Sequence, residues 1–145
     1  MMSTKLSLEC VRCVVDAVIE KSRVMGVAGI AVAIVDDGAH LVAFARMERA
    51  FIGAIELALN KASTAARFRV SSAQLGELSR NGGPLAGIEA SLPGLVTFGG
   101  GMPLMDCTGR CIGAIGVSGG LVEQDEVIAK AGVTAFNHVT SKENT

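Results

Sequence analysis

Residues 29–46, GIAVAIVDDGAHLVAFAR, give the clearest indication of the fold. Its first part, residues 29–36, is a continuous apolar run without in-and-out alternation, which is typical of a central strand covered on both faces. Asp37-Gly38 follows as a two-residue hairpin signal, and residues 40–46 return as a second strand. Because a tight hairpin implies antiparallel pairing, this stretch predicts the centre of an antiparallel sheet.

Amphipathic helices are predicted on either side of this hairpin. Residues 7–25 repeat apolar positions at the helical period, with Ser7 as a candidate N-cap and Gly26 as a stop signal. Residues 51–68 form a second such pattern, and a final helix is expected over residues 122–139. The apolar face of the second helix comprises Phe51, Ile55, Ala58, Ala62 and Ala65, and Ser71 or Ser72 caps a short helix that ends near Arg80.

The remaining segments are rich in glycine. Residues 81–94 hold two prolines and several glycines and predict a long loop, of a length that is often functional in compact domains. Three further short strands are expected at residues 95–98, 102–106 and 111–117. The sequence therefore predicts an α+β fold, with a five-stranded antiparallel sheet that carries helices on both faces.

Composition narrows the classes of protein that fit. The 145 residues are enough for one domain, and half of them are apolar. Thirteen basic residues nearly balance 14 acidic ones, which argues against a nucleic-acid partner. No run reaches the roughly 20 apolar residues of a membrane helix, and the N-terminus lacks a signal-peptide pattern, so we expect no membrane partner and a cytoplasmic location. Near-neutral charge with high hydropathy favours apolar surface covered by further subunits.

Four segments in the order of the chain resemble the GlcG/HbpS family. They are VAIVDDGAHLVAFARM (32–47), NKASTAARF (60–68), FGGGMPL (98–104) and IGAIGVSGGLVEQDEVIAKAG (112–132). The branch they are most similar to occurs as the C-terminal domain of PduO-type proteins. The resemblance implies a single GlcG/HbpS-like domain over residues 1–145, a profilin-like fold, ring-like homo-oligomers such as octamers, and haem or corrinoid as the ligand.

Candidate binding residues gather at two glycine-rich turns. Free N–H groups in Gly99-Gly100-Gly101 and in residues 118–120 could hold a carboxylate or phosphate, although such glycines also serve plain tight turns. Asp125, in the first turn of the last helix, is interpreted either as a ligand contact near the glycines or as a capping carboxylate. Lys61 could reach solvent, pair with Asp36 or Asp125, or meet an anionic ligand. Arg46, at a strand end, could hold a carboxylate or remain solvated.

Candidate metal ligands are few. Cys10, Cys13 and His40 are the weak candidates, with small buried thiols and an exposed histidine as the alternative interpretation. Cys107 and Cys111 bracket a turn, which together with the first pair only loosely resembles a zinc site. The resemblance implies a histidine on the first helix as the haem ligand, and this chain has none there.

Three functions remain open from the sequence. The first is a module that binds haem, a corrinoid or another planar cofactor in a cleft beside Gly99–Gly101, in an accessory or sensing role. The second is a small cofactor-independent enzyme that acts on a hydroxy acid or diol-derived metabolite, with Lys61 and Asp125 as acid and base. The third is a structural accessory subunit.

Overall fold

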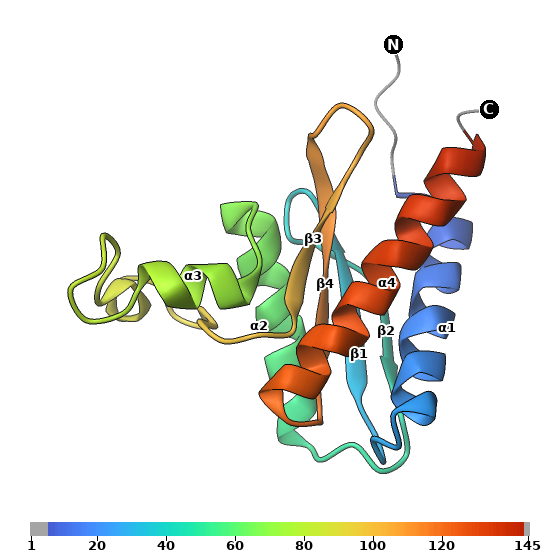
Figure 1. Cartoon of the computed structure of the whole chain (residues 1–145), viewed down its shortest axis with the longest axis horizontal. Helices are drawn as coiled ribbons and strands as arrows, with labels where there is room; N and C mark the ends of the chain where they lie inside the picture. Colours follow the sequence, from blue (N-terminus) through green and yellow to red (C-terminus); the bar gives the residue numbers. More distant parts are fainter. Residues whose placement is uncertain (1–5, 144–145) are drawn as a thin grey trace.

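A computed structural model describes residues 6–143 and shows one antiparallel sheet between helices (Figure 1). The helices are α1 (Leu8–Val24), α2 (Gly53–Phe68), α3 (Ser72–Leu78) and α4 (Val122–Glu143), with a 3-10 turn at Ile88–Ala90. The strands are β1 (Ala31–Asp36), β2 (Leu41–Arg46), β3 (Gly101–Met105) and β4 (Cys111–Ser118). They lie in the order β2-β1-β4-β3, and every neighbouring pair is antiparallel. The predicted α+β class is therefore confirmed.

The prediction of a fifth strand at residues 95–98 is wrong, because the sheet that residues 6–143 form has four strands and this segment is not one of them. The backbone of this segment is used against helices instead. The N–H of Val96 donates to the hydroxyl of Thr64 on α2 over 3.0 Å. The carbonyl of Thr97 lies so close to Gly76 of α3 that a Cβ at that glycine would overlap it. The segment is therefore held against α2 and α3 and lies apart from the sheet.

Two hydrophobic layers cover the sheet, one on each face. α1 and α4 lie side by side on one face, where valines of α1 pack with Ile34, Ile115 and Phe136 (Figure 1). α2 lies on the other face, and its alanines pack against Ala31, Ala33 and Ala114. β1 is buried along most of its length, as expected for a central strand covered on both faces.

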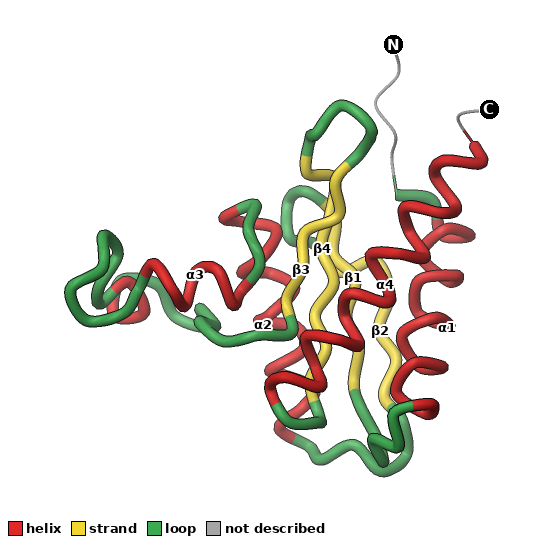
Figure 2. The backbone as a smooth tube through the Cα atoms, viewed as in Figure 1, coloured by secondary structure: helices red, strands yellow, loops and turns green. Residues whose placement is uncertain are grey.

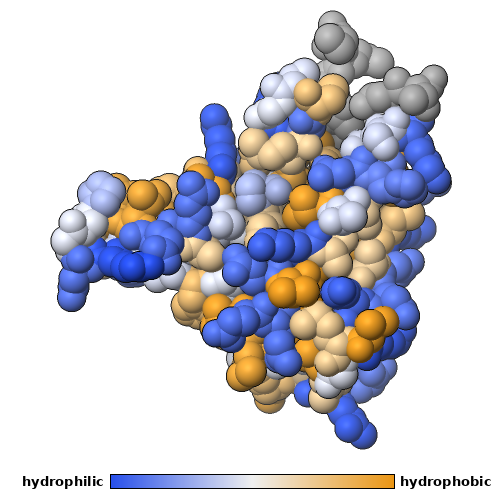
Figure 3. Space-filling view, viewed as in Figure 1, coloured by the Kyte–Doolittle hydropathy of each residue, from blue (hydrophilic) through white to orange (hydrophobic). Residues whose placement is uncertain are grey.

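The predicted helix ends are largely confirmed. Ser7 caps α1 by accepting from the N–H of Cys10, and Ser71 caps α3 by accepting from the N–H of Gln74. Phe51 is an exception: it precedes α2 and is exposed, so it does not belong to the buried face of that helix. α3 and the long loop after it form an arm that extends away from the sheet (Figure 2), and the arm also projects from the body in the space-filling view (Figure 3).

Both hairpin turns have the same backbone design, which differs from the predicted two-residue turn at Asp37-Gly38. In each, an aspartate carboxylate accepts from two backbone N–H groups: Asp36 from Gly38 and His40, and Asp106 from Thr108 and Arg110. The third turn residue is left-handed in both, at Ala39 (φ 64°) and Gly109 (φ 83°). Each loop is therefore three residues long, and each is followed by a shift in strand register.

The sheet has two distinct ends. We call the end with Ala31, Arg46, Ser118 and Gly101 the glycine end, because both glycine-rich segments lie there. We call the opposite end, with the two hairpin turns, the turn end. No helix among residues 6–143 is long and apolar enough to span a bilayer.

Candidate functional site

Lys61 and Asp125 meet at the glycine end as a buried ion pair. The Nζ of Lys61, on α2, lies 3.1 Å from the Oδ2 of Asp125, on α4, and the side chains are 1% and 3% exposed. The ammonium also donates to the carbonyl of Val117 at the end of β4, over 2.9 Å. This pair therefore joins two helices, from opposite faces of the sheet, to the strand between them.

The remaining polar groups of the pair are also satisfied. The Oδ1 of Asp125 accepts from the N–H of Gly120 over 2.8 Å, which orders the turn before α4. The centroid of the Phe98 ring lies 5.3 Å from Nζ, within the range of a cation–π contact, and the residue Phe98 is 42% exposed. Burial lowers the pKa of Lys61 from its ordinary value, and the carboxylate of Asp125 opposes that shift. A charge surrounded in this way is held in place rather than presented to a ligand.

The glycine turns beside this pair are tightly packed. A Cβ on Gly100, whose φ is +121°, would lie 2.5 Å from the carbonyl oxygen of Val117 and 2.7 Å from Nζ of Lys61. A Cβ on Gly99 would lie 3.3 Å from the Cβ of Glu126, and one on Gly101 would meet Ser72 Oγ at 2.9 Å. The N–H of Gly101 donates to that same hydroxyl. The space in which the sequence predicted a cleft is filled by Lys61 and its neighbours.

The other predicted binding residues lie apart from this cluster. Asp36 is at the turn end, where its carboxylate binds its own turn, so the alternative of a Lys61–Asp36 pair is wrong. The backbone N–H of His40 is the main cause of the lowered pKa of Asp36. Arg46 is exposed at the glycine end, but β1 separates its strand from β4. A ligand role for any of these residues remains a prediction.

The candidate metal ligands do not converge. Within residues 6–143, no group of three or more histidine, cysteine, aspartate or glutamate side chains is placed to hold a metal ion. His40 contacts Asp36, with Nδ1 3.3 Å from Oδ1. Cys10 is buried, Cys13 is exposed, and desolvation raises the pKa of the Cys10 thiol, with smaller contributions from Glu143 and Cys13. A thiol with a raised pKa is a poor metal ligand.

An open groove lies instead at the free edge of the sheet, between α1 and β2. Its volume is about 270 Å³, and its lining is mainly apolar, with a charge of each sign from α1. Leu8, Val15, Ala43 and Phe44 supply the apolar surface, and Arg12 and Asp16 the charges. Sequence reasoning missed this groove because Arg12 and Asp16 have the pattern of an ordinary solvated helix face.

The fold and the buried pair define a class of small α+β domains in which helices of both faces are tied together at one end of the sheet. The chain belongs to the HbpS-like family, whose model, described as haem degrading protein HbpS-like, matches residues 6–134. This confirms the family predicted from the four motifs, including its PduO-like branch.

Three relatives illustrate the range of the family. A Citrobacter freundii protein, an uncharacterized 15.0 kDa protein of the dhaT–dhaS intergenic region, is 36% identical over 107 residues, which are 73% of this chain and 75% of the relative. The corrinoid adenosyltransferase PduO of Salmonella typhimurium is 42% identical over 93 residues, 63% of this chain and 27% of PduO. The chain thus spans only about a quarter of that enzyme. A crystal structure described as a PduOC–haem complex has 35% identity and a TM-score of 0.86, covering 91% of this chain and 95% of that one.

Proposed function

We propose that this chain is a binding module for a planar tetrapyrrole such as haem, and that the α1–β2 groove receives the macrocycle. The observation that carries this proposal is the mainly apolar lining of that groove, with the charged side chains of Arg12 and Asp16 along α1. The PduOC–haem complex, of which this chain covers 95%, supports the choice of ligand. The accessory or sensing role predicted from the sequence is part of the same proposal.

The apolar residues of the groove suit the macrocycle of a tetrapyrrole, and its arginine suits a propionate carboxylate. Leu8, Val15 and Ala43 offer apolar contact for one face of a flat ring. Arg12 is exposed on the same helix, and its guanidinium is suited to bind a propionate through two parallel hydrogen bonds. Pockets that enclose a drug-sized ligand are about 300–1,000 Å³, so a groove of about 270 Å³ holds only part of a tetrapyrrole.

The same groove does not fit the iron of haem. None of its six lining residues is a histidine, cysteine, methionine or tyrosine, the side chains that ordinarily ligate haem iron. Cys10 packs in the core, and His40 lies in the first hairpin turn. We therefore propose that the groove binds the macrocycle and a propionate and supplies no ligand to the iron.

A second copy of the chain would cover the part of the tetrapyrrole that the α1–β2 groove leaves exposed. β2 is an edge strand, and its side chains are exposed at its two ends and half-buried between them. Among residues 6–143 no further strand pairs with this edge, and such an edge next to an apolar groove is a surface on which another subunit can pack. Self-association, as predicted from the sequence, is thus part of the proposal. Native mass spectrometry with and without hemin measures it, and a monomer that binds hemin at full affinity would contradict it.

The direct test is titration of the purified chain with hemin and with metal-free protoporphyrin IX, followed by absorbance. We expect saturable binding of both with affinities within a few-fold, because no iron ligand is involved. Arg12→Gln should weaken both by roughly tenfold, the effect of losing one charge-assisted contact. Arg23→Gln, an exposed arginine in the last turn of the same helix, is the matched control.

Two results would overturn this assignment. Hemin binding without protoporphyrin binding would show that an iron ligand is required, and His40→Ala would then test the first candidate. Equal binding by the wild type and the Arg12→Gln variant would remove the groove from the proposal.

The enzymatic alternative has less support from the geometry. Lys61 and Asp125 are buried and already bind Val117, Gly120 and each other, and neither lines the α1–β2 groove. A general acid or base must come within hydrogen-bond reach of a substrate proton. This pair could do so only after Phe98 and the Gly99–Gly101 turn had moved.

A further inference from the structure

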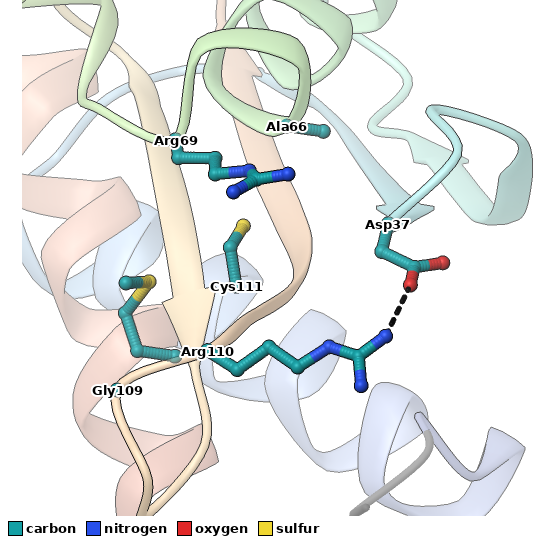
Figure 4. A pocket seen from close by; sticks show the side chains of 7 residues that line it. Asp37, Ala66, Arg69, Gly109, Arg110 and Cys111 are labelled. Carbon is teal, nitrogen blue, oxygen red and sulfur yellow. Dashed lines mark ion pairs between the residues drawn. The ribbon is translucent and has the colours of Figure 1, made fainter.

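A second cavity lies at the turn end, between the two hairpin turns and the C-terminus of α2 (Figure 4). Its volume is about 180 Å³, and it is more enclosed than the α1–β2 groove. None of its lining residues belongs to that groove or to the Lys61–Asp125 pair. The lining comprises Asp37, Ala66, Arg69, Met105, Gly109, Arg110 and Cys111.

Arg69 is the first reason to regard this cavity as a binding site. It ends α2 in the left-handed conformation, with a φ of 58°, and its N–H donates to the carbonyl of Ala65. Glycine is the usual residue at such a helix end, because a side chain there is strained. An arginine at this position keeps a guanidinium over the cavity, where it lies above the thiol of Cys111 (Figure 4). Within residues 6–143, no carboxylate lies within 4.0 Å of that guanidinium.

Arg110 and Asp37 supply the second reason. The backbone N–H of Arg110 is held by the carboxylate of Asp106 over 3.0 Å, which fixes the residue at the end of its turn. Its guanidinium reaches toward the other turn, where it lies 3.7 Å from the Oδ2 of Asp37. Two cations and one anion therefore line the cavity. The net charge of one positive unit is matched by a ligand with a single negative charge.

Size and charge together restrict the class of ligand. The cavity of about 180 Å³ is smaller than pockets for drug-sized molecules and more enclosed than the α1–β2 groove, so it suits a ligand of only a few heavy atoms. A phosphate, with close to two negative charges, would meet the carboxylate of Asp37, and a zwitterionic amino acid would leave the positive charge of the cavity unbalanced. A planar carboxylate matches the two parallel donors of a guanidinium.

We propose that the turn-end cavity binds a small organic monocarboxylate, whose carboxylate is held by Arg69 and whose organic part lies between the two hairpin turns. Arg110 and Asp37 form the far wall and disfavour ligands with a second charge. This site is independent of the tetrapyrrole proposal, since it is built from different elements.

The test uses the purified full chain and propionate as the probe. Propionate should shift the backbone amide resonances of Arg69 and of Gly109–Cys111 in a saturable way, with a dissociation constant on the order of 1 mM for so small a ligand. Inorganic phosphate and alanine should bind at least several-fold more weakly.

Arg69→Gly is the decisive variant, because glycine suits the backbone at this position. The variant should unfold at the same temperature as the wild type or a higher one, and it should bind propionate at least tenfold more weakly. Arg67→Ala, which removes an exposed arginine two residues earlier on the same helix, should bind propionate as the wild type does. Hemin binding should not change in either variant.

Three outcomes would overturn the proposal. They are the absence of any saturable propionate shift, tighter binding of phosphate than of propionate, and retention of propionate affinity in the stably folded Arg69→Gly variant.

Discussion

The two ends of the sheet hold similar residues but use them in opposite ways. At the glycine end, Lys61 of α2 meets a left-handed glycine, Gly100, and an aspartate of another element. At the turn end, Arg69 of the same helix lies near another left-handed glycine, Gly109, and another aspartate, Asp37. The first group is closed around its own charges, whereas the second leaves a cavity.

The difference comes from how the cation is satisfied. Lys61 has a carboxylate, a backbone carbonyl and an aromatic ring as partners, so no part of its charge is left for a ligand. Arg69 has no ion-pair partner among residues 6–143 and remains exposed. A buried, fully bonded charge stabilises the packing of elements, and an exposed, unpaired charge beside a cavity is available for recognition.

The largest effect on stability is expected when one partner of the buried ion pair is removed. Lys61→Met leaves the carboxylate of Asp125 buried without a counter-ion and should lower the free energy of unfolding by about 3–5 kcal/mol. Urea denaturation followed by circular dichroism measures this loss. If stability hardly changes, the pair does not hold the glycine end closed, and that end would again become a candidate binding site.

The matched control is the double variant Lys61→Met with Asp125→Asn. The amide oxygen of asparagine can still accept from the N–H of Gly120, and no uncompensated charge remains. We expect the double variant to recover about half of the stability lost in the single one.

A second prediction compares Gly100→Ala with Gly109→Ala. Both glycines have positive φ, but only at Gly100 would the new methyl group meet neighbouring atoms, including the carbonyl oxygen of Val117 at 2.5 Å. At Gly109 nothing lies within 4 Å. The backbone strain should cost about 1 kcal/mol at either position, and Gly100→Ala should cost roughly 2 kcal/mol more. Equal losses in thermal unfolding would contradict the tight packing of the glycine end.

The smallest expected effect concerns the turn end at low pH. Hydrogen bonds lower the pKa of Asp36, first from the N–H of His40, and the pKa of Asp106, first from the hydroxyl of Thr108. Since the folded-state pKa lies below the unfolded value of 3.8, each carboxylate stabilises the fold above that pH, and the contribution is lost as the pH falls through the folded-state pKa.

Acid titration of stability checks this linkage. Asp36→Asn and Asp106→Asn should each flatten the loss of stability below about pH 4, by a small amount because both turns are exposed to solvent. Asp37→Asn is the comparison, since Asp37 caps neither turn. An unchanged slope in both turn variants would show that these carboxylates do not contribute.

The elements that could be predicted from the sequence are those with a period or a cap. The apolar run of β1, the helical pattern of α1 and the capping serines Ser7 and Ser71 each determine local structure by themselves. Residues 95–98 look like a strand by composition, but their backbone partners lie on α2 and α3, and those contacts depend on the tertiary fold. The packing of a helix against the segment overrode its local preference.

The candidate site could be predicted only in part. Lys61 and Asp125 were identified as possible partners, and they do meet. The ammonium of Lys61 also donates to the carbonyl of Val117 and lies near the ring of Phe98. Neither contact has a signal in the sequence. The turn-end cavity combines Arg69, Arg110 and Asp37 from three separate segments, so only the folded chain shows that these charges are neighbours.

The alanines of α2 also limit how this domain can move. A Cβ on Gly116 of β4 would overlap the carbonyl oxygen of Ala58, so helix and strand touch backbone to backbone, with no side chains between them. A contact of this kind has no room to slide or rotate, and α2 behaves as a rigid rod seated on the sheet. Lys61 and Arg69 are eight residues apart on that rod, about 12 Å along the helix axis. A ligand held by Arg69 would therefore bind to the same rigid element that carries the buried ammonium of Lys61.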